Sequence, residues 1–193
     1  MKYRLFVAGV AALLGAIALA CGGNNNSTGS TQTGTLSIAM KDSPFSDAKA
    51  LFVTFSEVSV HMSGGEWKTL PFAGGASSRT CDLKKLTNAQ DVLGTGPLAA
   101  GHYTDIRLIV SSATIYFDNA SAAAACAPSI AAPAGTSAAV TIPSGTVQLN
   151  RQFDVPAGGA TTILLDFDGD KSVDQLGNGN YRMSPVITVV SVQ

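Results

Sequence analysis

The sequence is poor in charged residues, and the few charges form no cluster. Only 13% of its 193 residues are Asp, Glu, Lys or Arg, against about 25% in an ordinary soluble domain. The formal net charge is −1, and no stretch gathers the lysines and arginines that a nucleic-acid site requires. We therefore expect no nucleic-acid partner.

The residue patterns that many enzymes use are also missing. The chain has two histidines, His61 and His102, and it contains neither the G-x-S-x-G turn of serine hydrolases nor the H-E-x-x-H helix of zinc proteases. It has no C-x-x-C pair. These absences favour a protein that is not an enzyme, and they leave a hydrolase that uses His102 and Asp105 as the catalytic alternative.

Of the three cysteines, the first directly follows an apolar N-terminal segment. Lys2 and Arg4 precede the uncharged run 5–20, which is short for a membrane span, and Cys21 comes next. This order is typical of a secretory signal. The tail IALAC is similar to a bacterial lipobox, although Ala18 stands where Leu is commonest. We predict a lipoprotein signal peptide over 1–20, with an ordinary cleaved signal or an uncleaved anchor as alternatives.

The similarity to a lipobox implies that Cys21 is lipidated and that the membrane is a partner through this anchor. Lipoprotein anchors carry more than one acyl chain, which makes the attachment stable. Gly22, rather than Asp, follows the cysteine, and by analogy with known sorting signals this favours the outer membrane, facing the periplasm or the cell surface. Residues 22–33 have no apolar side chain, so we expect a flexible tether over 21–33.

The remaining cysteines, Cys81 and Cys126, are an even pair in an exported protein. In an oxidising compartment such a pair predicts one disulfide. Two separate buried thiols or a metal pair are the alternatives. The disulfide would tie down the stretch 118–136, an Ala-rich segment in which Pro128 and Pro133 limit any helix.

Alternation of apolar and polar residues dominates the rest of the chain. In the stretch 96–117 this period of two predicts a half-buried β-strand. One face carries Thr104, Ile106, Leu108 and Val110. The other face carries Tyr103, Asp105, Arg107 and Ile109. In the run 49–62 the pattern slips by one residue near Ser56 and Glu57. A β-bulge would keep one face buried there, and a strand that changes sheets is the alternative.

About nine such runs follow one another at short spacing, and no long helical pattern appears. A strand that is apolar on one face must bury that face against another layer. The sequence therefore predicts an all-β domain over 34–193, folded as a single antiparallel β-sandwich.

Several segments match a known family in order along nearly the whole domain. They are GTLSIAMKDSP (34–44), FVTFSEVSVHM (52–62), EWKTL (66–70), DLKKL (82–86), LAAGHYTDIRLIV (98–110), LLDFDGDKSV (164–173) and YRMSPVITV (181–189). Together they resemble the bacterial lipoprotein family catalogued as domain-of-unknown-function family 4382. LAAGHYTDIRL is also similar to transthyretin-like and carboxypeptidase-regulatory-like sandwiches. The resemblance implies an exported sandwich of transthyretin-like or immunoglobulin-like kind, and it carries no established activity and no catalytic residues.

Carboxylates recur around a glycine at Asp166, Asp168 and Asp170. Calcium prefers six to eight oxygen ligands, which a turn after a strand can supply in part. The order differs from an EF-hand loop, because Gly169 falls between the second and third Asp. A calcium site here is one hypothesis, and a polar strand end whose carboxylates bind loop amides is the alternative. A further pair, Asp42 and Asp47, could join the site only if their loop lies at the same end.

Two further arrangements are predicted on strands. Asp105 and Arg107 share a strand face in the alternating pattern, which predicts an ion pair between them. Four aromatic residues could line a sugar-binding face, and packing in the core or on a sheet surface is the alternative. These residues are Trp67, Tyr103, Tyr116 and Tyr181.

Taken together, the sequence favours a non-enzymatic, lipid-anchored β-sandwich module of the cell envelope, with a binding or structural role toward an envelope protein or a glycan. A calcium-dependent or carbohydrate-binding surface module is the first alternative, and an envelope hydrolase is the second. Calcium is the only cofactor that the residues suggest.

Overall fold

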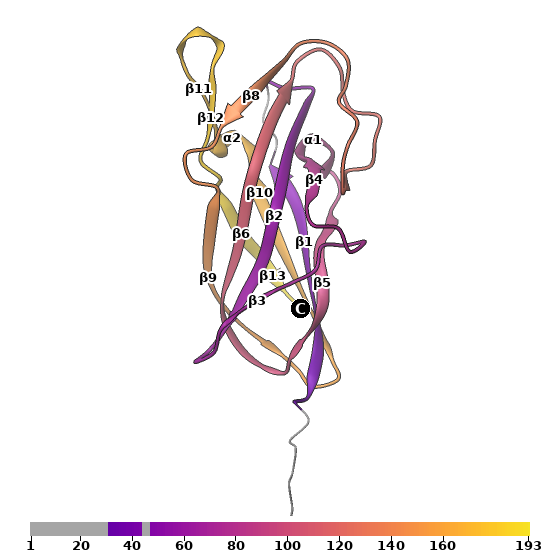
Figure 1. Ribbon diagram of the computed structural model, residues 1–193, viewed down its shortest axis with the longest axis vertical. Coiled ribbons are helices and arrows are strands. Elements are labelled where there is room, and N and C mark those ends of the chain that lie inside the picture. Colours follow the sequence, from indigo (N-terminus) through magenta and orange to yellow (C-terminus); the bar gives the residue numbers. More distant parts are fainter. Residues whose placement is uncertain (1–30, 44–46) are drawn as a thin grey trace, which may run out of the picture. The chain divides into compact units, whose positions relative to one another are not determined.

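The computed structural model describes residues 31–43 and 47–193, which form two β-sheets packed face to face (Figure 1). The predicted signal peptide, Cys21 and most of the predicted tether lie outside the described residues. One sheet has four strands in the order β13-β10-β1-β5. The other has nine strands, with the path β11-β12-β8-β6-β2-β4-β7, β3 beside β2 and β9 beside β6. This two-layer arrangement confirms the predicted β-sandwich.

Strands account for most of the described chain, and the helices are single turns. The strands are β1 (Thr33–Ser43), β2 (Ala50–Met62), β3 (Trp67–Thr69), β4 (Arg79–Asp82), β5 (Asp91–Ala99), β6 (Gly101–Tyr116), β7 (Cys126–Ala127), β8 (Ser137–Thr141), β9 (Thr146–Val155), β10 (Ala160–Asp168), β11 (Val173–Gln175), β12 (Tyr181–Met183) and β13 (Ile187–Val192). The helices are α1 (Leu83–Leu86), α2 (Gly169–Ser172) and the 3₁₀ turn η1 (Gly177–Gly179). In the described part of the chain, no helix has the length and apolar character needed to cross a membrane.

The four-stranded sheet is built around β1 and β10, which run parallel from Thr35 opposite Ala160 to Ser43 opposite Asp168. Their alternating apolar residues point toward the other sheet and are fully buried. These residues are Leu36, Ile38 and Met40 in β1, and Ile163, Leu165 and Phe167 in β10. The sandwich is therefore mixed, whereas the sequence predicted antiparallel strands throughout. Hydrophobic alternation reports which face is buried but not the direction of a neighbouring strand.

The nine-stranded sheet is built around β2 and β6, which pair antiparallel along almost their whole length. The register shifts between Phe55 and Glu57, which confirms the predicted bulge near Ser56 and leaves Phe55 and Val58 both buried. A second shift lies between Tyr103 and Asp105 where β6 pairs with β9. This bulge turns Tyr103 into the core, so its predicted place on the same face as Asp105 is wrong.

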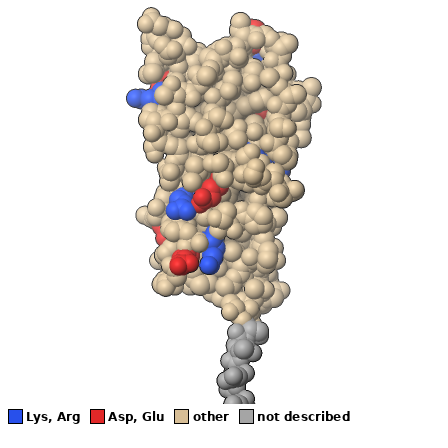
Figure 2. All heavy atoms as spheres, in the orientation of Figure 1, with Lys and Arg blue, Asp and Glu red and all other residues tan. Residues whose placement is uncertain are grey.

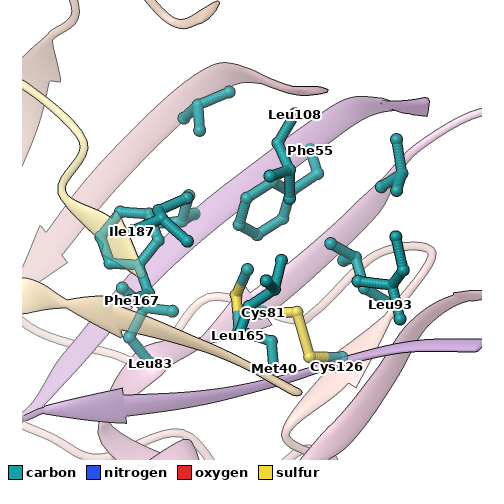
Figure 3. Close-up of a cluster of buried hydrophobic side chains, with 14 of the residues drawn as sticks. Met40, Phe55, Cys81, Leu83, Leu93, Leu108, Cys126, Leu165, Phe167 and Ile187 are labelled. Carbon is teal, nitrogen blue, oxygen red and sulfur yellow. A yellow bond between two sulfur atoms is a disulfide. The ribbon is translucent and has the colours of Figure 1, made fainter. Parts of the chain in front are cut away.

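Cys81 and Cys126 form the predicted disulfide. They lie directly opposite each other in the antiparallel pair β4–β7, and both side chains are buried. Figure 3 shows the bridge within the cluster of buried core side chains. The bridge fastens the long connection between β6 and β8 to the edge of the nine-stranded sheet. Because β7 has only two residues, the covalent bond supplements a short stretch of strand pairing.

Removal of the disulfide should lower the free energy of unfolding by about 4 kcal/mol, the chain-entropy value for a loop of this length. The loop spans 45 residues. The measurement is urea unfolding of the Cys81→Ala/Cys126→Ala double variant beside the oxidised protein. Reductant should destabilise the parent protein and leave the double variant unchanged. Equal stability of the two proteins in the absence of reductant would contradict a structural role for the bridge.

Candidate functional site

Asp166 and Asp168 lie at the end of β10 and have partners within the protein. Ser43 donates to both carboxylate oxygens of Asp166 at 3.3 and 3.2 Å, and Lys41 forms an ion pair with Asp166 at 3.3 Å. Asp168 caps α2 by accepting from the Lys171 amide at 3.0 Å, and the Lys171 ammonium lies 2.6 Å from it. The hydrogen bonds that Lys171 donates lower the pKa of Asp168. The two carboxylates therefore accept hydrogen bonds from loop and side-chain donors, which is the arrangement expected of a polar strand end without calcium.

Asp170 lies in the first turn of α2 and is exposed. Within residues 31–43 and 47–193, no three His, Cys, Asp or Glu side chains are arranged to hold a metal ion. Calcium at Asp166, Asp168 and Asp170 is therefore only one of the two hypotheses that the sequence offers for these aspartates.

Asp42 is at the same end of the sandwich but continues the buried face of β1. It is 4% exposed, and its register partner is the buried Phe167. Among the residues that the structure describes, neither of its carboxylate oxygens has a hydrogen-bond partner, although a buried polar group without a partner is costly. Asp42 therefore lies at the same end of the sandwich as the aspartate cluster, as a shared site would require. Its side chain, however, points to the inner face of the sheet, while Asp166 lies on the outer face.

Burial raises the pKa of Asp42 from 3.8 to about 8, and the carboxylates of Asp166 and Asp168 add to this effect. The backbone amide of Gly169 and the charge of Lys84 oppose it, although the amide does not meet hydrogen-bond geometry at either oxygen. The neutral acid is therefore the form that the folded protein favours at neutral pH.

The predicted hydrolase pair is not brought together by any hydrogen bond. His102 contacts Asp154, with 2.8 Å between Nδ1 and Oδ1, and Asp154 is its direct neighbour across β6–β9. Asp105 instead accepts from Thr104 at 2.6 Å and from Gln148 at 3.1 Å. A catalytic His–Asp pair requires a direct contact that orients the imidazole, and each of these two residues has a different partner.

Polar and aromatic side chains gather instead on the outer face of β3, β2, β6 and β9, which we call the Trp67 face. Direct cross-strand neighbours form two rows on it. The first row is Trp67, His61, Asp105 and Asn150, and the second is Thr69, Ser59, Arg107 and Gln148. Because directly opposed residues on adjacent strands have Cβ atoms about 5 Å apart, these eight side chains form one continuous patch.

Trp67 is held in place by one side chain from β6 and one from β2. The Arg107 guanidinium carbon lies 4.3 Å from the centre of the indole, which is cation–π geometry. The His61 ring is 5.2 Å away and tilted by 49°. Trp67 and Arg107 come from β3 and β6, with β2 between them, so they meet above β2. Ser59 of β2 lies beneath them and is fully buried.

Arg107 forms its ion pair with Glu57, at 2.7 Å, and not with Asp105 as the sequence predicted. The register shift between Phe55 and Glu57 places Glu57 on the outer face beside Arg107. Hydrogen bonds from Arg107 and Ser59 lower the pKa of Glu57. The pairing was not predictable from spacing on one strand, because the partner comes from the adjacent strand.

Three of the four aromatic residues predicted for a sugar-binding face have other positions. Tyr103 and Tyr181 are buried in the core, and Tyr116 packs on Phe52 with 4.8 Å between ring centres. Of the four, only Trp67 lies on the Trp67 face. The four aromatic residues therefore do not form one face, and the tyrosines follow the alternative of packing in the core or on the sheet surface.

The fold defines the chain as a two-sheet β-sandwich domain with a polar–aromatic outer face. The family model described as Domain of unknown function (DUF4382) matches residues 33–185, and the chain belongs to this family. No curated protein and no solved structure matches the chain. The family supplies no assigned activity, so a function must be argued from the residues themselves.

The buried carboxyl of Asp42 should make the protein less stable as pH rises. Between about pH 4 and pH 8 the folded protein holds a proton that the unfolded chain releases, so the free energy of unfolding falls through this window. The loss is up to roughly 4 kcal/mol from about pH 5 to pH 8, at about 1.4 kcal/mol per pH unit. Urea unfolding across this range measures it.

Asp42→Asn should flatten this pH dependence, because an amide cannot ionise. The matched control is Asp170→Asn, which removes an exposed carboxylate at the same end and should leave the slope unchanged. An Asp42→Asn variant with the parent's slope would contradict the raised pKa.

Calcium should leave the melting temperature unchanged, because Asp166 and Asp168 already have protein partners. Differential scanning calorimetry in millimolar calcium and in chelator tests this, since a ligand that binds the folded state raises its stability. An increase in melting temperature with calcium that Asp168→Asn abolishes would instead support the calcium site.

Proposed function

We propose that the protein is a non-enzymatic binding module, held in the cell envelope by lipid on Cys21. The observation that carries the proposal is the Cys81–Cys126 disulfide in a domain that follows a signal similar to a lipobox. Disulfides persist in oxidising compartments and are rare in the cytosol. The outer membrane, facing the periplasm or the cell surface, is the proposed location.

The cysteine count supports the same conclusion. The sequence has three cysteines, and the disulfide uses two of them. Cys21 is the remaining one, and it stands where a lipoprotein signal ends. The first strand, β1, begins at Thr33, so eleven residues, 22–32, lie between the proposed anchor and the start of the sandwich.

The contacts of the candidate residues do not support the predicted His102–Asp105 hydrolase. His102 and Asp105 have separate partners, and the polar groups of the Trp67 face are held by one another. A rigid, prearranged surface suits recognition, because little conformational entropy is lost when a partner binds. An envelope protein or a glycan is the proposed partner. We also propose that the sandwich is of the transthyretin-like kind.

Lipid attachment is expected at Cys21 alone. Cells that express the protein and are fed an alkyne-tagged fatty acid should yield labelled protein in the membrane fraction. Cys21→Ser should abolish the label and release the protein from the membrane. The Cys81→Ala/Cys126→Ala variant should remain labelled and is the matched control. Label on the Cys21→Ser variant, or cytosolic protein that retains residues 1–20, would contradict the proposal.

A further inference from the structure

We propose that the Trp67 face binds an uncharged polysaccharide. This inference rests on the proposed binding function and gives it a site and a class of ligand. The face lies on the front of the sandwich in Figure 1, where β2 and β6 cross in front of β1 and β10.

The face has the shape that an extended sugar chain requires. Four adjacent strands present their outward side chains in two cross-strand rows, so the surface is a sheet face rather than a closed pocket. A polymer can lie across such a surface with several of its units in contact, whereas a deep pocket encloses a small ligand.

Trp67 provides the apolar contact. The faces of an aromatic ring carry negative charge density and attract the weakly positive C–H groups of a sugar ring. The indole is partly exposed and is fixed by Arg107 at 4.3 Å and His61 at 5.2 Å. Because the ring is held before binding, less side-chain entropy is lost when a sugar packs on it.

The neighbouring side chains provide the polar contacts. Sugar hydroxyls both donate and accept hydrogen bonds, and they are best matched by amides beside carboxylates. Asp105 lies between Gln148 and Asn150, both exposed on β9. Hydrogen bonds from Thr104 and Gln148 lower the pKa of Asp105, so its carboxylate is an ionised acceptor. Acceptors and amide donors thus alternate beside the indole.

The charges on the face favour an uncharged ligand. Arg107 is paired with Glu57 at 2.7 Å, and at the edge Lys68 is paired with Glu66 at 3.9 Å. Figure 2 shows the same side of the molecule as mostly uncharged, with the few charged groups of opposite sign close together. A surface of this kind lacks the net positive charge that attracts polyanions.

A protein partner fits the face less well. The core of a protein–protein interface is apolar and depleted in charge, whereas the two rows consist mostly of polar side chains. The large apolar residues that are exposed in the described chain are Val92, Leu176 and Val190. None of them belongs to β2, β3, β6 or β9, whose large apolar side chains, Trp67 included, are at most partly exposed.

Trp67 is the only tryptophan in the sequence, so tryptophan emission, excited selectively over that of the tyrosines, reports on this site alone. The mature chain, purified with Cys21→Ser, is run in affinity electrophoresis against soluble β-glucan, xylan, galactomannan and dextran. At least one polysaccharide should retard it, and titration with that polysaccharide should change the tryptophan emission. Retardation by none of the four, or binding without a change in emission, would overturn the inference.

Variants then locate the site. Trp67→Ala should weaken binding at least tenfold, as removal of a central aromatic contact does. Gln148→Ala, an exposed change that leaves the core intact, should weaken binding several-fold even if Trp67→Ala fails to fold. Val190→Ala, on β13 in the other sheet, is the control and should bind like the parent. Unchanged binding by the folded Trp67→Ala and Gln148→Ala variants would overturn the inference.

The test separates this inference from the proposed function. Lipid labelling at Cys21 is measured in cells, and polysaccharide binding is measured with purified protein. If the purified protein binds no polysaccharide but Cys21 is labelled in cells, the polysaccharide inference is overturned and the proposed lipid-anchored module stands. Capture of an envelope protein through the Trp67 face, without polysaccharide binding, would assign the face to a protein and overturn the inference.

Discussion

The structure depends on the contact between the inner faces of its two sheets. β2 and β6 supply one face and β1 and β10 supply the other, and Phe55 meets Phe167 across the interface in an edge-on contact, with 6.3 Å between ring centres. Figure 3 shows these two rings among the apolar side chains of the core. Since successive residues of a strand point to opposite sides, fixing the inner residues also fixes which residues face solvent.

Two β-bulges determine the composition of the outer face. The shift between Phe55 and Glu57 allows β2 to keep Phe55 and Val58 inside while Glu57 turns outward to Arg107. The shift between Tyr103 and Asp105 turns the tyrosine inward and leaves the carboxylate outside. Without these extra residues a strand would lose either its buried pattern or its polar outer row. The Trp67 face is therefore a consequence of the way in which the core is packed.

The sequence predicted those features that depend on neighbours along the chain. Alternation located the main strands and the bulge near Ser56, and the number of cysteines predicted the disulfide. The sequence did not predict the parallel pairing of β1 with β10, because apolar and polar residues alternate in the same way in parallel and antiparallel strands. Nor did it predict that Arg107 would meet Trp67 and Glu57, since these contacts join three strands. The aspartates at the end of β10 were found as a motif, but the hydrogen bonds that they accept from Ser43 and Lys171 required the structure.

Asp42 and the Trp67 face show two different ways in which this domain holds polar groups. Asp42 continues the buried side of β1 and has no hydrogen-bond partner in the described part of the chain, so its environment favours the neutral acid. On the Trp67 face, by contrast, Glu57 and Asp105 each accept hydrogen bonds and stay ionised. A polar group with partners in place can exchange them for those of a ligand at little cost, whereas an isolated buried group cannot. The proposed ligand recognition therefore belongs on the outer sheet face, and the end of β1 is better understood as a part of the core whose stability depends on protonation.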